Sequence, residues 1–313
     1  MPEKLGNGGH GREEYDPNTG KYVADGQPNK VYNNPEENGS IGRETTLKKP
    51  INKMTHDEIL TEIKESAEKL KKFNIVPDTR LFNEFPKFSL GFVRQAVSLC
   101  EKYKIDPHLF NLVVGQEVWP NIVAEYAPSS IASCDLEINI YYSRDYIEKR
   151  FNGNLITMHN IFINKNKVSS DYDVLPLIKD GVSKGWINDS NDDFCYEYFA
   201  SHELGHVLSF NLINELYKKG EELFDRKANY SLDGISGYYQ KFYDEIFSVY
   251  KEQNPGSEEK DFANDCSDYS KTHIVEWFAE TFASMNGGKP TKVALAMKEW
   301  LDRRFSDNIG GDF

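Results

Sequence analysis

Two histidines and a glutamate, arranged as His202-Glu203-Leu204-Gly205-His206, are the residues best suited to chemistry in this sequence. Residues four apart on a helix lie on one face, so His202 and His206 can present two imidazole nitrogens to one metal ion. Glu203 then lies beside the ion without being needed as a ligand and can polarise a metal-bound water. Gly205 leaves room for a neighbouring helix to pack closely. The spacing therefore predicts half of a catalytic zinc site.

A catalytic zinc ion takes three protein ligands and leaves a fourth coordination position open for water or substrate. The segment Glu276-Trp277-Phe278-Ala279-Glu280 lies in a helical pattern and supplies candidates for the third ligand. Glu276 and Glu280 share one helix face, so both can point toward the same buried site. One would bind the metal, and the other could hold a ligand histidine through its second ring nitrogen. The alternative is an acidic stripe that faces solvent.

Together these motifs resemble the catalytic domain of anthrax toxin lethal factor and the related gluzincin-type peptidases. In that family a tyrosine stands seven positions before the glutamate that opens an E-aromatic-Phe-Ala-Glu segment, and Tyr269 and Glu276 reproduce this spacing. The resemblance covers roughly 195–210 and 269–285, so it carries over no substrate preference. It implies a zincin-like fold in which His202, His206 and Glu276 bind zinc. It also implies that Glu203 is the general base and that the hydroxyl of Tyr269 assists the developing oxyanion. Glu280 would be the carboxylate that holds a ligand histidine.

The residues and the resemblance predict a zinc metallopeptidase, a hydrolase that binds one Zn2+ per chain. We expect an endopeptidase that acts on a protein or peptide substrate, with Glu203 taking the proton of a zinc-activated water. Two alternatives stay open at this point. The chain could be a catalytically silent zincin-fold binding or assembly protein, associated with a toxin or a virion, or a zinc hydrolase acting on a non-peptide bond.

Apolar residues recur at helical spacing on both sides of the two motifs. The pattern predicts a helix over about 193–219 that carries the histidines, and another over 235–253. A third helical stretch, over 272–305, is interrupted at 286–290 by Gly and Pro. The metal ligands are therefore expected on two separate helices.

Upstream, Thr55 and Glu58 have the spacing of a capping box, which predicts a helix from 55 to 73. A further helix is expected over 90–103. These helices would belong to a small N-terminal unit.

Alternating apolar residues over 136–142 and β-branched and aromatic residues over 155–164 predict strands. The predicted fold class is α+β, mainly helical, with a small sheet before the active-site helix. The expected division is a polar, flexible tail at 1–50, a small helical unit at 51–130 and a zincin-like metallopeptidase domain at 131–313.

Two further histidines lie near the predicted site elements. His159 falls in the strand over 155–164, which we interpret as an edge strand that pairs with the substrate backbone, and His159 itself as structural. His273 stands three residues before Glu276 and is interpreted as a surface residue, with a supporting group or a competing ligand as alternatives.

The net charge of −13 argues against nucleic acid as a partner, because the chain would repel a phosphate backbone. Neither a secretory signal nor an apolar run long enough to span a membrane is evident, so we expect a soluble protein, cytoplasmic by default, with non-classical export or virion association as alternatives. The 4 cysteines lack CxxC spacing, which favours buried, reduced thiols over a cysteine metal site.

Overall fold

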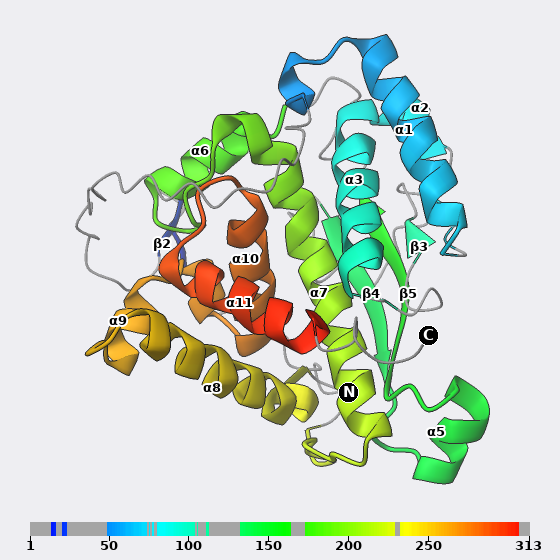
Figure 1. Ribbon diagram of the computed structural model, residues 1–313, viewed down its shortest axis with the longest axis vertical. Coiled ribbons are helices and arrows are strands. Elements are labelled where there is room, and N and C mark those ends of the chain that lie inside the picture. Colours follow the sequence, from blue (N-terminus) through cyan, green and yellow to red (C-terminus); the bar gives the residue numbers. More distant parts are fainter. Residues whose placement is uncertain are drawn as a thin grey trace.

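The structure is a computed structural model that describes residues 14–16, 21–23, 49–73, 75, 77, 80–103, 105, 111–112, 132–163, 173–228 and 232–306. Figure 1 shows a mainly helical molecule with a small sheet on one side of a long central helix. The predicted α+β class, dominated by helices, is therefore confirmed. None of the described helices is both long enough and apolar enough to cross a lipid bilayer.

The segment predicted as a polar tail contains two described strands, β1 (Glu14–Asp16) and β2 (Lys21–Val23), which pair antiparallel. Most of this segment lies outside the described residues. A single 3-10 turn, η1 (Ile51–Lys53), then leads into the first helix.

Both helices predicted upstream are present. In α1 (His56–Lys71) the backbone N–H of Glu58 donates to Thr55 Oγ1 over 3.3 Å, and the N–H of Thr55 donates to the Glu58 carboxylate over 2.7 Å, so the capping box is confirmed. The hydrogen bonds from Lys49 and from the Thr55 backbone hold the pKa of Glu58 at about 2. A short helix that was not predicted, α2 (Arg80–Glu84), precedes α3 (Pro86–Tyr103).

The sheet contains β3 (Asn111–Leu112), β4 (Ala132–Ile138) and β5 (Ile156–Ile163) in the order β3-β5-β4. β4 pairs antiparallel with β5, and β3 pairs parallel with it. The predicted strand over 136–142 is correct only in its first part, because the chain turns where Tyr142 N–H donates to the Asn139 carbonyl over 3.1 Å. The alternation of apolar residues continues through that turn, so the sequence pattern extended the predicted strand too far.

The interpretation of residues 155–164 as an edge strand is wrong, because β5 lies between two partners and β4 is at the edge of the described sheet. The parallel partner comes from a distant part of the chain, which local alternation cannot reveal. The hairpin between β4 and β5 also contains α5 (Arg144–Phe151), whose N-cap Ser143 accepts from Tyr146 N–H over 3.3 Å.

The predicted active-site helix is α7 (Cys195–Lys218), which follows α6 (Leu175–Ser183) and the turn η2 (Asp192–Phe194). α7 packs against α3, against α10 (Ile274–Asn286) and against the sheet. Nearly all its side chains are buried, since it has packed neighbours on several sides. It therefore runs through the middle of the molecule, as Figure 1 shows.

The C-terminal helices also agree with the sequence pattern. η3 (Leu232–Ile235), α8 (Ser236–Gln253) and α9 (Glu259–Asn264) are followed by η4 (Tyr269–Lys271), then by α10 and α11 (Lys292–Ser306). The predicted break lies between α10 and α11, where Gly288 has a φ of +79° that favours glycine.

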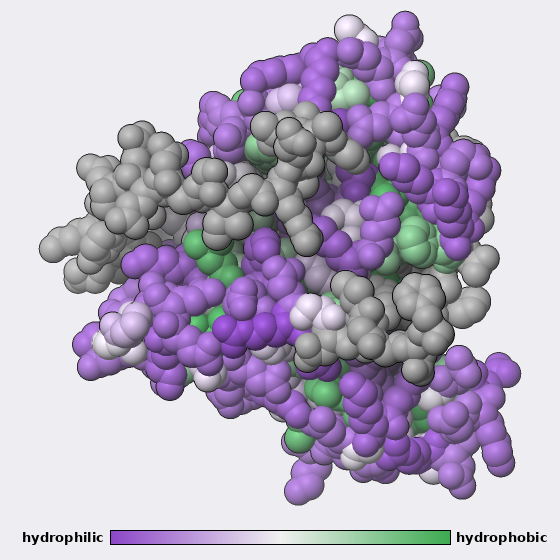
Figure 2. Space-filling model, in the orientation of Figure 1, coloured by the Kyte–Doolittle hydropathy of each residue, from purple (hydrophilic) through white to green (hydrophobic). Residues whose placement is uncertain are grey.

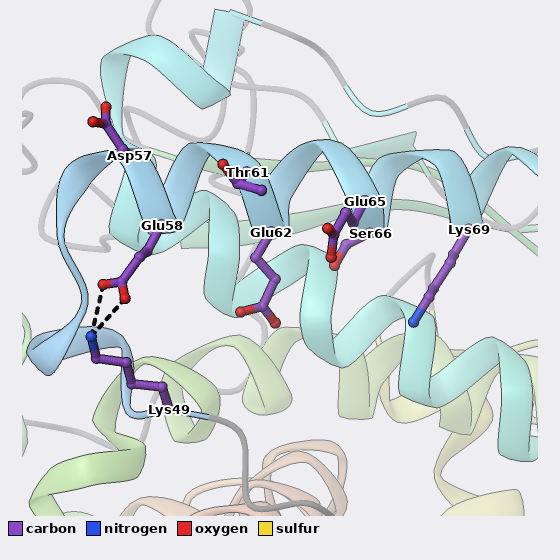
Figure 3. A pocket seen from close by; sticks show the side chains of 8 residues that line it. All are labelled: Lys49, Asp57, Glu58, Thr61, Glu62, Glu65, Ser66 and Lys69. Atoms are coloured by element: carbon purple, nitrogen blue, oxygen red, sulfur yellow. Dashed lines mark hydrogen bonds and ion pairs between the residues drawn. The ribbon is translucent and has the colours of Figure 1, made fainter.

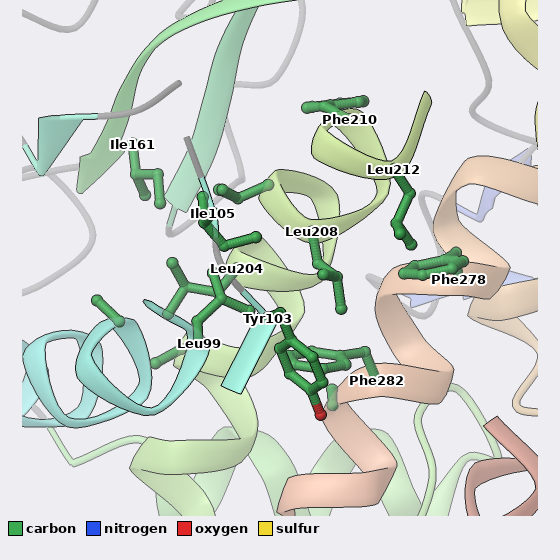
Figure 4. Close-up of a cluster of buried hydrophobic side chains, with 14 of the residues drawn as sticks. Leu99, Tyr103, Ile105, Ile161, Leu204, Leu208, Phe210, Leu212, Phe278 and Phe282 are labelled. Atoms are coloured by element: carbon green, nitrogen blue, oxygen red, sulfur yellow. The ribbon is translucent and has the colours of Figure 1, made fainter. Parts of the chain in front are cut away.

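The core is continuous between the N-terminal helices and the rest of the chain, and the predicted domain division stays a prediction. One cluster in Figure 4 contains Leu99 and Tyr103 of α3, Leu204 and Leu208 of α7, and Phe278 and Phe282 of α10. Charge also links these elements, because buried Arg94 of α3 pairs with Glu62 of α1 at 2.6 Å and with Glu197 of α7 at 2.8 Å.

The outer side of α1 carries a polar groove, which Figure 3 shows with its Lys49–Glu58 ion pair. None of the residues that line this groove belongs to the predicted site. The described surface in Figure 2 is mostly hydrophilic.

Candidate metal centre

The site is built where α7 and α10 cross at unusually close range. A Cβ placed on Gly205 of α7 would lie 2.9 Å from the Cα of Ala279 and 3.3 Å from its carbonyl oxygen. Only a residue without a side chain allows this approach, so the predicted packing role of Gly205 is confirmed. The crossing brings the two histidines of α7 next to the first turn of α10.

His202, His206 and Glu276 converge on one point, as the sequence motifs predicted. Each offers one ligand atom, and the three atoms lie within 4.8 Å of one another. Glu276 Oε2 is 3.3 Å from His202 Nε2 and 3.5 Å from His206 Nε2. Two ligands in a tetrahedral zinc site are separated by about 3.3–3.4 Å, because each metal–ligand bond is about 2.0–2.1 Å long. The two separations from Glu276 are therefore close to those between neighbouring ligands of a tetrahedral divalent ion.

The Glu276 carboxylate has one buried oxygen without a well-formed hydrogen bond. Oε2 is buried and forms no hydrogen bond of acceptable geometry, although it faces two imidazoles. A buried polar atom without a partner costs free energy, and a cation in this position would remove that cost. The side chains of His202, His206 and Glu276 keep 15, 10 and 16 per cent of their surface exposed, respectively, so the edges of the cluster remain open to solvent.

The electrostatics of the cluster point the same way. Burial would lower the pKa of His202, but its contacts with Glu276 and Glu280 outweigh burial and raise that pKa well above its ordinary value. Burial would likewise raise the pKa of Glu276, but His206 and His202 hold it well below the usual range. The cluster thus favours positive charge beside its carboxylates, which a divalent cation can supply in place of protons.

Glu280 lies behind His202, where the sequence analysis placed a supporting carboxylate. His202 Nδ1 donates to Glu280 Oε1 over 2.9 Å, which turns Nε2 toward the other candidate ligand atoms. Two further donors hold the carboxylate, Tyr198 at 2.9 Å and Ser267 at 3.2 Å. The sequence analysis missed both, since neither belongs to a recognisable motif.

Glu203 and Tyr269 complete the group of predicted site residues. Glu203 is only 7 per cent exposed and follows His202 on α7. The ring of Tyr269 packs on that of His202, with centroids 5.6 Å apart and planes 27° apart. Burial, followed by the negative charges of Glu276 and Glu203, raises the pKa of Tyr269 well above its ordinary value. The phenol therefore keeps its proton and can donate a hydrogen bond.

Comparisons of the chain with protein-family models, with curated proteins and with solved structures found no match. Function is therefore inferred from the chemistry and geometry of the site. Among the described residues, His202, His206 and Glu276 are the one group of three or more His, Cys, Asp or Glu side chains arranged to hold a metal ion.

The second candidate ligand, His206, and the neighbouring His273 have different surroundings. His206 packs on Phe210, and its Nδ1 is buried without a hydrogen-bond partner, unlike the corresponding atom of His202. His273 is not a surface residue. Its Nδ1 accepts from Val275 N–H over 3.2 Å and its Nε2 lies 3.0 Å from Asp233, so it caps the N-terminus of α10. The side chain of His159 lies outside the described residues.

Proposed function

We propose that the protein is a zinc-dependent endopeptidase of the gluzincin type, with a zincin-like fold around α7 and α10. One observation carries the proposal. Two imidazole nitrogens face one buried carboxylate oxygen, and the separations of 3.3 and 3.5 Å from that oxygen are close to those between neighbouring ligands of a tetrahedral ion. Three ligands of this kind are the donor set of a catalytic zinc site, in which a fourth position stays open.

His202, His206 and Glu276 would hold the ion, which when bound polarises a carbonyl and lowers the pKa of water. Glu280 fixes the tautomer of His202. Glu203 accepts a proton from the attacking water and passes it to the leaving amine. Tyr269 donates a hydrogen bond to the oxygen of the peptide carbonyl as negative charge develops there.

The general-base role of Glu203 gives the first test. Glu203→Gln keeps the size of the side chain but removes its ability to accept a proton, so kcat should fall about 100- to 10,000-fold. The variant should still bind one equivalent of zinc, because Glu203 is not a ligand. Substrates would come from a peptide library derived from a proteome, with cleavage read by mass spectrometry and metal content by elemental analysis.

Each outcome of this test distinguishes the proposals. Cleavage by the zinc-loaded protein that survives in Glu203→Gln would overturn the mechanism. A zinc-loaded chain that cuts no peptide in the library would favour the silent binding or assembly protein instead. Absence of zinc binding would remove the zinc endopeptidase but not the silent binding or assembly protein.

A further inference from the structure

We propose that Trp186 is a positioning residue, which holds the Tyr269 phenol in the orientation needed to donate its hydrogen bond. The proposal rests on the proposed function, and it concerns a residue that no motif in the sequence marks. Trp186 lies on the chain between α6 and η2, outside both metal-binding motifs.

Trp186 touches Tyr269 in two ways. The indole and phenol rings pack together with centroids 5.2 Å apart and planes tilted by 38°. The backbone N–H of Tyr269 donates to the Trp186 carbonyl over 2.9 Å, and the adjacent N–H of Asp268 donates to the Gly185 carbonyl over 3.0 Å. Side chain and backbone therefore attach the start of η4 to the loop that holds Trp186.

The loop itself is fixed by the end of α6. Trp186 N–H donates to the Gly181 carbonyl over 2.9 Å, and Gly185 N–H donates to the Val182 carbonyl over 3.0 Å. This pair of bonds, with Gly185 at a φ of +71°, is a Schellman motif, the compact ending of a helix. Trp186 thus occupies a defined position after α6.

Tyr269 needs such support because of where it lies. It begins a single 3-10 turn, η4, so the regular hydrogen bonds of a long helix do not fix it. Its ring contacts His202, itself a candidate ligand, and Trp186. A phenol that donates to a developing oxyanion must be held to within a fraction of an ångström, since displacement by about 1 Å can cost 100-fold in rate.

A positioning role predicts a specific kinetic pattern. The hydrogen bond from Tyr269 forms as charge develops, so losing its orientation should lower kcat and leave KM nearly unchanged. A role for Trp186 as a wall for a substrate side chain would instead raise KM. Trp186 is half-buried, so this alternative has to be distinguished by experiment.

The experiment is a double-mutant cycle in the full-length, zinc-loaded protein. Tyr269→Phe should lower kcat about 100-fold, and Trp186→Ala about 10- to 100-fold. In the Tyr269→Phe background, Trp186→Ala should cause no further loss, because no hydroxyl is left to orient. Trp186→Phe should recover kcat to within about threefold of the parent, because it restores an aromatic neighbour.

Three controls keep the result interpretable. Trp186→Leu retains bulk without an aromatic ring and replaces Trp186→Ala if that variant does not fold. Tyr146→Ala removes a partly exposed aromatic ring of α5, whose centroid lies 4.7 Å from that of the Tyr142 ring. This substitution should leave kcat unchanged. Zinc content should stay at one equivalent in every variant, because Trp186 is not a ligand.

Additive losses in the cycle, a rise in KM alone, or full activity in both Trp186→Ala and Trp186→Leu would each overturn the positioning role. These outcomes differ from failure of the proposed function, in which the parent protein binds no zinc or cleaves no peptide.

Discussion

Replacing Gly205 by alanine should weaken zinc binding without touching any ligand. The new Cβ would lie 2.9 Å from Ala279 Cα and 3.2 Å from Phe282 Cβ. Carbon atoms that are not bonded prefer separations of about 3.5–4.0 Å. Since the closest neighbour is backbone, α10 has to move away from α7 by roughly 0.6–1 Å.

The ligand geometry sets the size of the effect. Glu276 belongs to α10 and would move with it. The distances from its Oε2 to the Nε2 atoms of His202 and His206, now 3.3 and 3.5 Å, would grow to roughly 4 Å or more. A tetrahedral zinc ion spans only about 3.3–3.4 Å between ligands. We expect zinc affinity to fall at least about 100-fold, and stability to fall by about 1–3 kcal/mol from overpacking.

Zinc affinity would be measured by competition with a chromophoric chelator, and stability by thermal unfolding of the metal-free protein. Gly91→Ala is the matched control, because its Cβ would lie 2.9 Å from the Tyr196 carbonyl where α3 meets α7. Both substitutions replace a helical glycine in a close helix contact, so their effects on helix propensity cancel in the comparison. Only Gly205→Ala lies at the crossing of α7 and α10, which brings the candidate ligands together.

The two variants should therefore lose similar stability but differ sharply in zinc affinity. Unchanged zinc affinity in Gly205→Ala would refute the reasoning, because the crossing would then not control the ligand separations. An equal loss of affinity in Gly91→Ala would also refute it, since the effect would then follow from general destabilisation.

Three further outcomes are expected. Chelation of the metal should lower Tm by about 5–10 °C, because a ligand at 100 times its Kd stabilises the native state by about 2.7 kcal/mol. Added zinc should restore the Tm, whereas added magnesium should not. An unchanged Tm would argue against a metal site. Glu280→Gln should weaken zinc binding about 10- to 100-fold, since the charge that orients His202 is lost, and competition titration measures this. Burial raises the pKa of Cys100, Cys195 and Cys266 to about 12, so iodoacetamide at pH 8 should label these thiols only after unfolding, as mass spectrometry would show.

The parts of the molecule that the sequence predicted well depend on local interactions. The capping box at Thr55 and the pairing of His202 with His206 both depend on residues three or four apart. The third ligand is distant in sequence, but a second helical motif with its own spacing marked it. Helical periodicity thus predicted both halves of the site, and the structure brings the halves together.

The parts that the sequence did not predict depend on contacts between distant segments. β5 is central rather than an edge strand, because residues 111–112 pair with it from far upstream. Tyr198 and Ser267 bind the Glu280 carboxylate, yet neither stands in a motif. The capping role of His273 was missed because histidine is not among the preferred N-cap residues.

The position of the candidate ligands on packed helices bears on what a bound metal would do for the protein. His202 and His206 lie on a helix that is buried along nearly its whole length, and Glu276 lies in the first turn of a helix packed against it. Hydrophobic burial therefore holds the three candidate ligands together by itself, in contrast to a small zinc domain whose folding depends on metal. Removing zinc should lower Tm while the helical circular dichroism persists, which separates a preformed catalytic site from a structural one.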